Sequence, residues 1–274
     1  MIAVDGIILV ITCQKHLHIR LKEHFNLKEN IGNWKVIKVI GDLFIDCDYK
    51  LEGDMMTIKC EDSYIHLLKK VVLSFQYLYE MFDIKEGILR CGDDLIFNEN
   101  NLETFLKSSK KHEINGDEYI DIDYMGKTAL YASTINYNLK YDHDKSEIDN
   151  FMVGYYQCNP DDINNPLHNL KGVDIAKYMR RPYIPNYVGG PLMYLSNKSC
   201  KILINHMSNI NYDIFHYDNI TDSYPYTIED MAIGFILLSN NINIIDAKYW
   251  WCWGELREPQ LIPMCIAVHT NKYK

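Results

Sequence analysis

Apolar and polar residues follow two periodicities along this chain, and their order predicts a mixed α/β fold. Runs rich in β-forming residues predict strands at 7–12, 34–40, 54–60 and 88–89. Segments with helical patterning predict helices at 18–26, 62–82 and 100–109. A cap at Asp62 or Ser63 is expected to start the long second helix. The strand–helix–strand order at the start of the chain indicates a parallel sheet.

The second half of the chain has a different pattern. Residues 119–185 are rich in Tyr, Asp and Asn and are punctuated by prolines, which predicts extended segments and long loops of the kind that bind substrates. A flexible turn and a short strand are expected at 188–196, with Ser196 capping a following helix. Thr227 and Asp230 form an acidic version of the capping box at the start of another helix.

Composition narrows the class of protein. The chain has 274 residues, 47% of them hydrophobic, which suits one large α/β domain. A net charge of −9 argues against a nucleic-acid partner, because binding phosphates needs clustered Lys and Arg. The eight cysteines form no CxxC pair, so a zinc site is disfavoured and reduced thiols are expected. The apolar run 7–11 is too short for a membrane span and lacks a signal-peptide pattern, so we expect a cytoplasmic protein, in the host cytoplasm if it is viral.

Two adjacent carboxylates, Asp93 and Asp94, interrupt an apolar, strand-like run at 88–97. Buried anions pair with a cation, coordinate a metal or take up a proton, because isolated burial costs several kcal/mol. Gly92 just before them allows a turn or the close approach of a ligand. The run therefore predicts a divalent-metal and phosphate site at the end of a strand, and the alternative is a solvated surface turn.

Taken in order, these motifs resemble those of the β-1,3-galactosyltransferase and Fringe-like family of inverting glycosyltransferases. The family patterns KxDDDVF, DxYxNLTxK, GGGYVLS and EDVxxG resemble residues 90–96, 62–70, 189–196 and 229–234, and its IRxTW region is echoed by Ile19-Arg20. One position departs from the family: Gly92 stands where the first aspartate of the metal motif is expected. The resemblance spans roughly residues 7 to 269.

This resemblance implies a single GT-A-type domain over 1–274, with a mostly parallel sheet flanked by helices. A nucleotide-sugar-binding half would cover about 1–118, and an acceptor-binding and catalytic half about 119–274. The implied reaction is metal-dependent, inverting transfer of a hexose or N-acetylhexosamine from a UDP-sugar to a glycan hydroxyl, as a β-1,3-type hexosyltransferase. Mn²⁺ or Mg²⁺ is the implied cofactor.

The resemblance also implies roles for individual residues. Asp230 is the expected base, which the helix dipole would keep ionised. The implied metal ligands are Asp94 and His269. The implied donor-site residues are Asp93, Arg20 and Lys70, and the implied acceptor-site residues are Gly189, Gly190, Glu229 and Trp251.

Simpler interpretations stay open for each of these positions. Asp230 can serve only as a helix cap, His269 can be structural, and Lys70 can be a solvated helix residue. The tryptophans can pack in the core, and the Gly-Gly pair can be an ordinary turn. For the whole chain, the alternatives are a non-catalytic sugar- or nucleotide-binding module and a nucleotidyltransferase. The second would need a Gly-rich phosphate loop with a Lys, which this sequence lacks.

Overall fold

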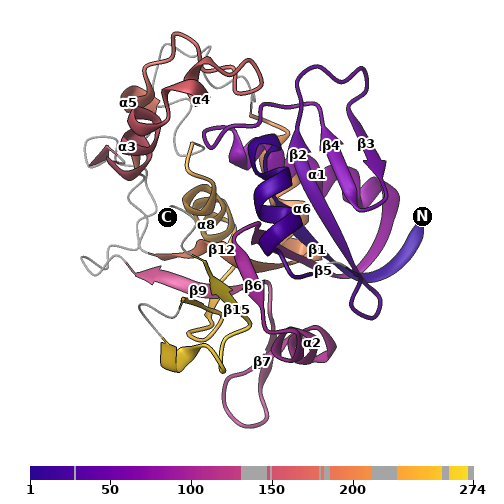
Figure 1. Ribbon diagram of the computed structural model, residues 1–274. Helices are drawn as coiled ribbons and strands as arrows, with labels where there is room; N and C mark the ends of the chain where they lie inside the picture. The colour runs from indigo at the N-terminus through magenta and orange to yellow at the C-terminus, as the bar shows by residue number, and fades with distance from the viewer. Residues whose placement is uncertain are drawn as a thin grey trace.

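The structure is a computed structural model that describes residues 1–27, 29–130, 147–148, 150–178, 180–181, 186–210, 227–254 and 259–270. An eight-stranded sheet forms its centre (Figure 1). The strand order is β13 (Ile244–Asp246), β9 (Tyr124–Leu130), β12 (Asn186–Ser196), β5 (Phe82–Gly92), β1 (Ile2–Ile11), β2 (Trp34–Gly41), β4 (Met55–Ile58) and β3 (Tyr49–Glu52). Strands β5, β1, β2 and β4 run parallel, whereas β12 is antiparallel to both neighbours.

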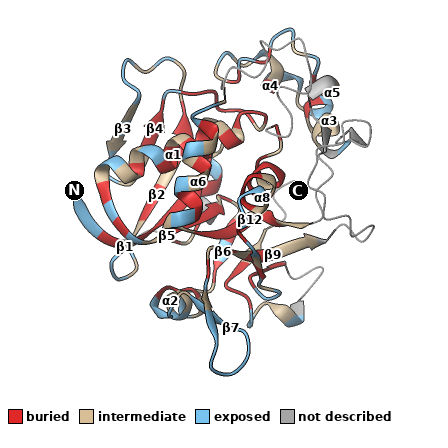
Figure 2. Ribbon diagram, turned by 180° about the vertical axis from the view of Figure 1, so that it is seen from behind, coloured by how far each residue is buried: buried red, intermediate tan, exposed pale blue. Residues whose placement is uncertain are grey.

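Both faces of the sheet are covered, which explains the continuous apolar runs of its central strands. On β1, Ile7 and Leu9 belong to one core cluster and Ile8 and Val10 to another, as the alternation of side chains along a strand requires. The helices α1 (Leu67–Met81), α6 (Asn197–Met207) and α8 (Glu229–Ser239) pack together on the first face, and their inner sides are buried (Figure 2). The result is the mixed α/β, GT-A-like single domain that the sequence predicts.

The opposite face carries smaller elements. They are the π-helix η2 (Leu17–His24), α2 (Glu99–Lys107) and a three-stranded sheet of β14 (Trp251–Trp253), β15 (Ala267–His269) and β6 (Leu95–Phe97). The remaining short elements are η1 (Gln14–His16), β7 (Lys111–Glu113), β8 (Tyr119–Asp121), β10 (Glu147–Ile148), α3 (Asn150–Cys158), α4 (Pro160–Asn164), α5 (Ile175–Tyr178), β11 (Arg180–Arg181) and η5 (Pro259–Leu261). Within the described part of the chain, no helix is both long and apolar enough to cross a membrane.

Several local predictions differ from the structure. The long helix begins at Leu67 and not at 62, because 62–66 form a turn in which the Ser63 hydroxyl accepts a hydrogen bond from His66 N. The segment 188–196 belongs to an eleven-residue strand, since β12 finds partners on both sides. Three helices, α3 to α5, occupy part of the predicted loop region, where buried residues such as Tyr156 give them a small core.

The predicted capping box of the last long helix is wrong. Ile228 is the N-cap of α8, and no side chain makes the capping hydrogen bond. Thr227 precedes that position and is buried. The Asp230 carboxylate accepts from the backbone N–H of Met231 and of Gly190, so it satisfies donors on two elements instead.

Candidate active site

A cavity of about 540 Å³ lies at the carboxyl ends of β1 and β5. Ligand sites of open α/β sheets lie at this edge. The cavity is lined by all the residues predicted for the site except Gly189 and Trp251. The fold therefore brings together positions from 20 to 269 that the sequence could connect only through a resemblance.

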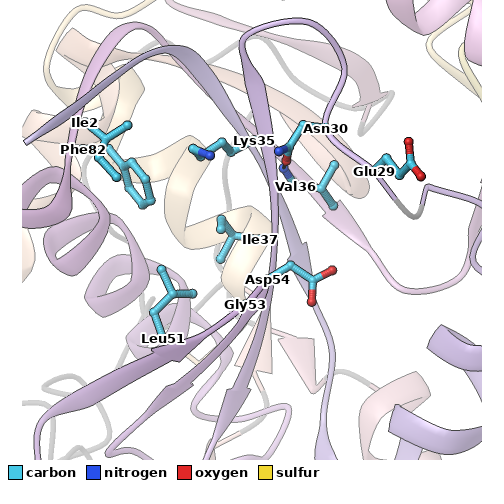
Figure 3. Close-up of a pocket in the computed structure, with 10 residues that line it drawn as sticks. All are labelled: Ile2, Glu29, Asn30, Lys35, Val36, Ile37, Leu51, Gly53, Asp54 and Phe82. Atoms are coloured by element: carbon cyan, nitrogen blue, oxygen red, sulfur yellow. Dashed lines mark hydrogen bonds between the residues drawn. The ribbon is translucent and has the colours of Figure 1, made fainter.

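A second cavity, of about 640 Å³, lies at the opposite edge of the sheet (Figure 3). It is lined by residues that begin β1, β2 and β5, including Ile2, Lys35 and Phe82, and by the β3–β4 turn at Gly53 and Asp54. None of the predicted site residues lines it. The first cavity is therefore the candidate active site.

Asp93 is buried and already paired inside the protein. Its carboxylate accepts hydrogen bonds from Thr12 Oγ1 at 2.8 Å and from Arg20 Nη1 at 3.1 Å, and His16 Nδ1 lies 3.5 Å away. Burial lowers the pKa of Arg20, but the surrounding groups, chiefly Asp93, together outweigh burial and raise this pKa. The expectation of a cation beside the buried carboxylates is confirmed for Asp93. Sequence reasoning missed Thr12 and His16, although both follow the first strand.

Asp94 turns toward a different partner. Its Oδ2 lies 3.3 Å from Nε2 of His269, and both side chains are partly accessible. The contact depends on the pairing of β15 with β6, which places His269 opposite Leu95, and on Thr270 N, which donates to the Asp94 carbonyl at 2.9 Å. Oxygen and imidazole nitrogen are ligands that suit Mn²⁺ and related cations. The two residues predicted as ligands of one metal therefore lie close enough together to contact the same ion.

The protein offers few ligands to such a metal. Among the residues that the structure describes, no group of three or more His, Cys, Asp or Glu side chains could hold a metal ion. Mg²⁺-type ions in phosphate sites commonly take one or two protein ligands, with substrate oxygens and water filling the rest. Asp94 and His269 fit that pattern, whereas the carboxylate of Asp93 is committed to Arg20.

Asp230 lies in the first turn of α8 and lines the cavity. One carboxylate oxygen accepts from Gly190 N at 2.9 Å and the other from Met231 N at 2.8 Å. Burial raises the pKa of Asp230, while these N–H groups and the Arg90 cation act in the opposite direction. Burial is thus stronger than the combined effect of these N–H groups and Arg90. A raised pKa makes a carboxylate a stronger base.

Arg90 and Glu229 form a buried ion pair beside Asp230. Arg90 Nε lies 3.0 Å from Glu229 Oε1, and Nη2 donates to Oε2 at 3.1 Å. Burial raises the pKa of Glu229 to about 7, against the opposing effect of Arg90. Glu229 was predicted for the acceptor site, but Arg90 was given no role. An arginine inside an apolar strand was the signal that could have identified it.

Lys70 is buried and is not a solvated helix residue. Its Nζ donates to Asp62 Oδ1 and to the Thr12 carbonyl, both at 2.7 Å. The Asp62 carboxylate also accepts from Gln14 N at 2.8 Å and Gly41 N at 2.9 Å. This carboxylate therefore ties α1 to the chain just after β1 and to the end of β2. Asp62 and Lys70 themselves line the cavity.

Of the tryptophans at 250, 251 and 253, only Trp253 lines the cavity, and Trp251 packs beside it. Trp251 is buried, with its ring centroid 5.2 Å from that of Trp253, and Lys127 Nζ lies 4.7 Å from its ring centroid. A Cβ built on Gly189 would lie 3.7 Å from the Trp251 ring, so Gly189 packs against it. Trp253 is 37% exposed and lines the cavity. Packing thus accounts for Trp251, and Trp253 is the ring available to a ligand.

Helices α3 and α4 border the cavity through a polar contact. Lys15 Nζ lies 3.0 Å from Asp162 Oδ1, and the Tyr155 hydroxyl donates to Oδ2 at 2.5 Å. Burial opposes ionisation of Asp162, but these two donors outweigh it and lower its pKa. Met152 and Tyr155 line the cavity from this side. Sequence reasoning anticipated substrate-binding segments here, but not these residues.

Comparison with known proteins adds one finding. A family model described as Galactosyltransferase matches residues 38–248, which is more than half of the chain. The matched region contains Asp93, Asp94 and Asp230, whereas Arg20 and His269 lie outside it. A search of curated proteins gave no significant match.

Proposed function

Because this chain belongs to the galactosyltransferase family, and is therefore a glycosyltransferase, we propose that it carries out metal-dependent, inverting transfer of a hexose or N-acetylhexosamine. The donor is a UDP-sugar and the acceptor a glycan hydroxyl, in a β-1,3-type linkage. The observation that carries the proposal is a single cavity that holds both the Asp94–His269 pair and Asp230. Inverting transfer needs a site for the leaving diphosphate and a base for the acceptor in reach of one sugar.

The nucleotide-sugar donor binds at the carboxyl ends of β1 and β5. Asp94 and His269 would hold Mn²⁺ or Mg²⁺, which would supply Lewis-acid stabilisation of the departing UDP. Asp93 and Arg20 fix the turn beside them through their mutual ion pair. Lys70 helps to shape the donor site by holding Asp62, because its ammonium is paired with that carboxylate.

On the acceptor side, Asp230 takes the proton from the attacking hydroxyl. Its raised pKa strengthens it as a base, and the Gly190 N–H fixes the direction of one carboxylate oxygen. The edge of the cavity at Gly190 and Trp253 offers a backbone turn and an aromatic ring to a sugar. Glu229 pairs with Arg90 at this edge, and Trp251 packs against Gly189.

The test measures UDP release from UDP-galactose, UDP-glucose and their N-acetyl analogues, with Mn²⁺ and with EDTA. We expect Asp94→Ala and Asp230→Asn each to lower kcat by about 10²-fold or more. Lys38→Met is the control, because the Lys38–Asp54 pair borders the other cavity. Equal UDP release from wild type, Asp94→Ala and Asp230→Asn would refute catalysis. Binding of UDP without turnover of any donor would favour the non-catalytic sugar- or nucleotide-binding module.

We also propose that the enzyme works in the cytoplasm. None of the eight cysteines, all of which lie among the described residues, forms a disulfide, in keeping with a reducing compartment. Imaging of the tagged full-length protein is the test, and its appearance in the secretory lumen would contradict this placement.

A further inference from the structure

Arg90, Gly190, Asp230 and Glu229 form a closed ring of contacts. The guanidinium donates from Nη2 to Glu229 Oε2 at 3.1 Å, and its Nε lies 3.0 Å from Glu229 Oε1. Its Nη1 donates to the Gly190 carbonyl. The Gly190 N–H in turn donates to Asp230 Oδ2 at 2.9 Å. Asp230 follows Glu229 in the chain, which closes the ring.

Three elements meet in this ring. Arg90 is on β5, Gly190 is on the adjacent antiparallel strand β12, and Glu229 and Asp230 begin α8, which packs on β12. The side chains of Arg90 and Glu229 are only 5% and 3% exposed. A planar guanidinium with several fixed N–H directions can hold a carboxylate and a carbonyl at once, which a lysine ammonium cannot do with the same geometry.

The arrangement leaves little freedom for the peptide at Gly190. A Cβ built there would lie 3.3 Å from Asp230 Oδ2, so the backbone passes close to the carboxylate. Arg90 fixes the carbonyl side of this residue while the N–H side meets Asp230. The two groups belong to successive peptide planes that share the Gly190 Cα, so Arg90 restrains the N–H by holding this Cα in place.

We propose that Arg90 is a positioning residue that, with Glu229, orients the Asp230 carboxylate through the backbone of Gly190. This inference rests on the proposed role of Asp230 as the base. A purely structural ion pair would hold β5 against α8 and leave Asp230 unaffected. Replacing the pair by apolar residues distinguishes the two alternatives, because such replacements often preserve stability.

The first experiment measures the hydrogen bond between the Gly190 amide and Asp230, and it needs no donor sugar. Labelling with [¹⁵N]glycine gives a spectrum from only 14 glycines, and Gly190→Ala assigns the Gly190 amide. In wild type this resonance should titrate with Asp230, and the titration should vanish in Asp230→Asn. We expect the Arg90→Met/Glu229→Met double variant to move the resonance upfield as the hydrogen bond to Asp230 lengthens, and the control Lys38→Met to leave it unchanged.

Single variants give a second readout through charge. Arg90, Glu229 and Tyr124 are titratable or charged groups that act on Asp230 from β5, α8 and β9. Loss of the cation in Arg90→Met should raise the Asp230 midpoint by about one pH unit, whereas Glu229→Gln should lower it, since Arg90 then lacks its counter-ion. Shifts in opposite directions are not expected from a general loss of structure.

Kinetics complete the test. The double variant should lose about 10- to 100-fold in kcat for UDP-sugar turnover, with KM for the donor within about threefold of wild type, because a misplaced base slows chemistry and not donor binding. Thermal unfolding monitors the fold of each variant, and Arg90→Lys should restore charge but not the full kcat.

The outcomes separate the inference from the proposed function. An unchanged Gly190 resonance together with wild-type kcat in the folded double variant would overturn the positioning role. If Asp230→Asn itself retained wild-type turnover, both the proposed base and its positioning would fail.

Discussion

Lys70→Met should destabilise the protein strongly, because it leaves a buried carboxylate without its cation. The Lys70 and Asp62 side chains are only 3% and 2% exposed, and their charged atoms are 2.7 Å apart. Removing one partner of a buried ion pair costs about 3–5 kcal/mol. Asp62 keeps hydrogen bonds from Gln14 N and Gly41 N, so the expected loss is about 3 kcal/mol, at the lower end of that range.

Asp62→Asn should have a cost of similar size for a different reason. Both carboxylate oxygens of Asp62 accept N–H donors, and an amide NH₂ would face one of them. Each single variant loses the same Lys70–Asp62 ion pair, so the double variant Lys70→Met/Asp62→Asn loses that pair only once. We therefore expect the two losses to be non-additive, with a coupling of about 2 kcal/mol.

Urea unfolding followed by tryptophan fluorescence measures these free energies. The exposed Glu103–Lys107 pair on α2 supplies the control, and Lys107→Met should change stability by less than about 0.5 kcal/mol. Lys70→Met within about 0.5 kcal/mol of wild type would refute the reasoning. Additive single-variant losses would also refute it, since they would mean that Lys70 and Asp62 do not stabilise each other.

Three further predictions concern ionisation, helix capping and metal binding. The pKa of Glu229 is raised to about 7 in the folded protein, so the native state binds the proton more tightly and stability should fall as pH rises from about 4.5 to 7. Glu229→Gln should reduce this slope in unfolding curves at different pH values, and an unchanged slope would contradict the raised pKa. Asn98→Ala should cost about 1 kcal/mol in urea unfolding, because the Asn98 side chain caps α2 through Asn101 N, and Asn98→Ser should keep most of that stability. Mn²⁺ with UDP should raise the Tm of wild type but not of Asp94→Ala or His269→Ala, and an equal rise in all three would contradict the proposed ligands.

Much of the fold could be predicted from local pattern. The strand at 34–40 and the helix at 100–109 are confirmed as β2 and α2 to within two residues, and the strand at 7–12 is confirmed as β1, which begins earlier, at Ile2. Their patterns were readable because buried parallel strands need continuous apolar runs, and surface helices need one apolar face. The extent of β5 and β12 was underestimated, because pairing with neighbours lengthens strands beyond what propensity alone indicates.

The sequence by itself determined the candidate chemistry: two carboxylates at a strand end, a Gly-Gly turn and an acidic helix start, in an order that resembles one family. Only the tertiary structure decided which of these groups meet. It commits Asp93 to Arg20, turns Asp94 toward His269 and places Arg90 against Glu229. The physical reason is that charges and hydrogen bonds act over a few ångströms in space, whereas these partners lie far apart in the chain and are brought together only by strand pairing and helix packing.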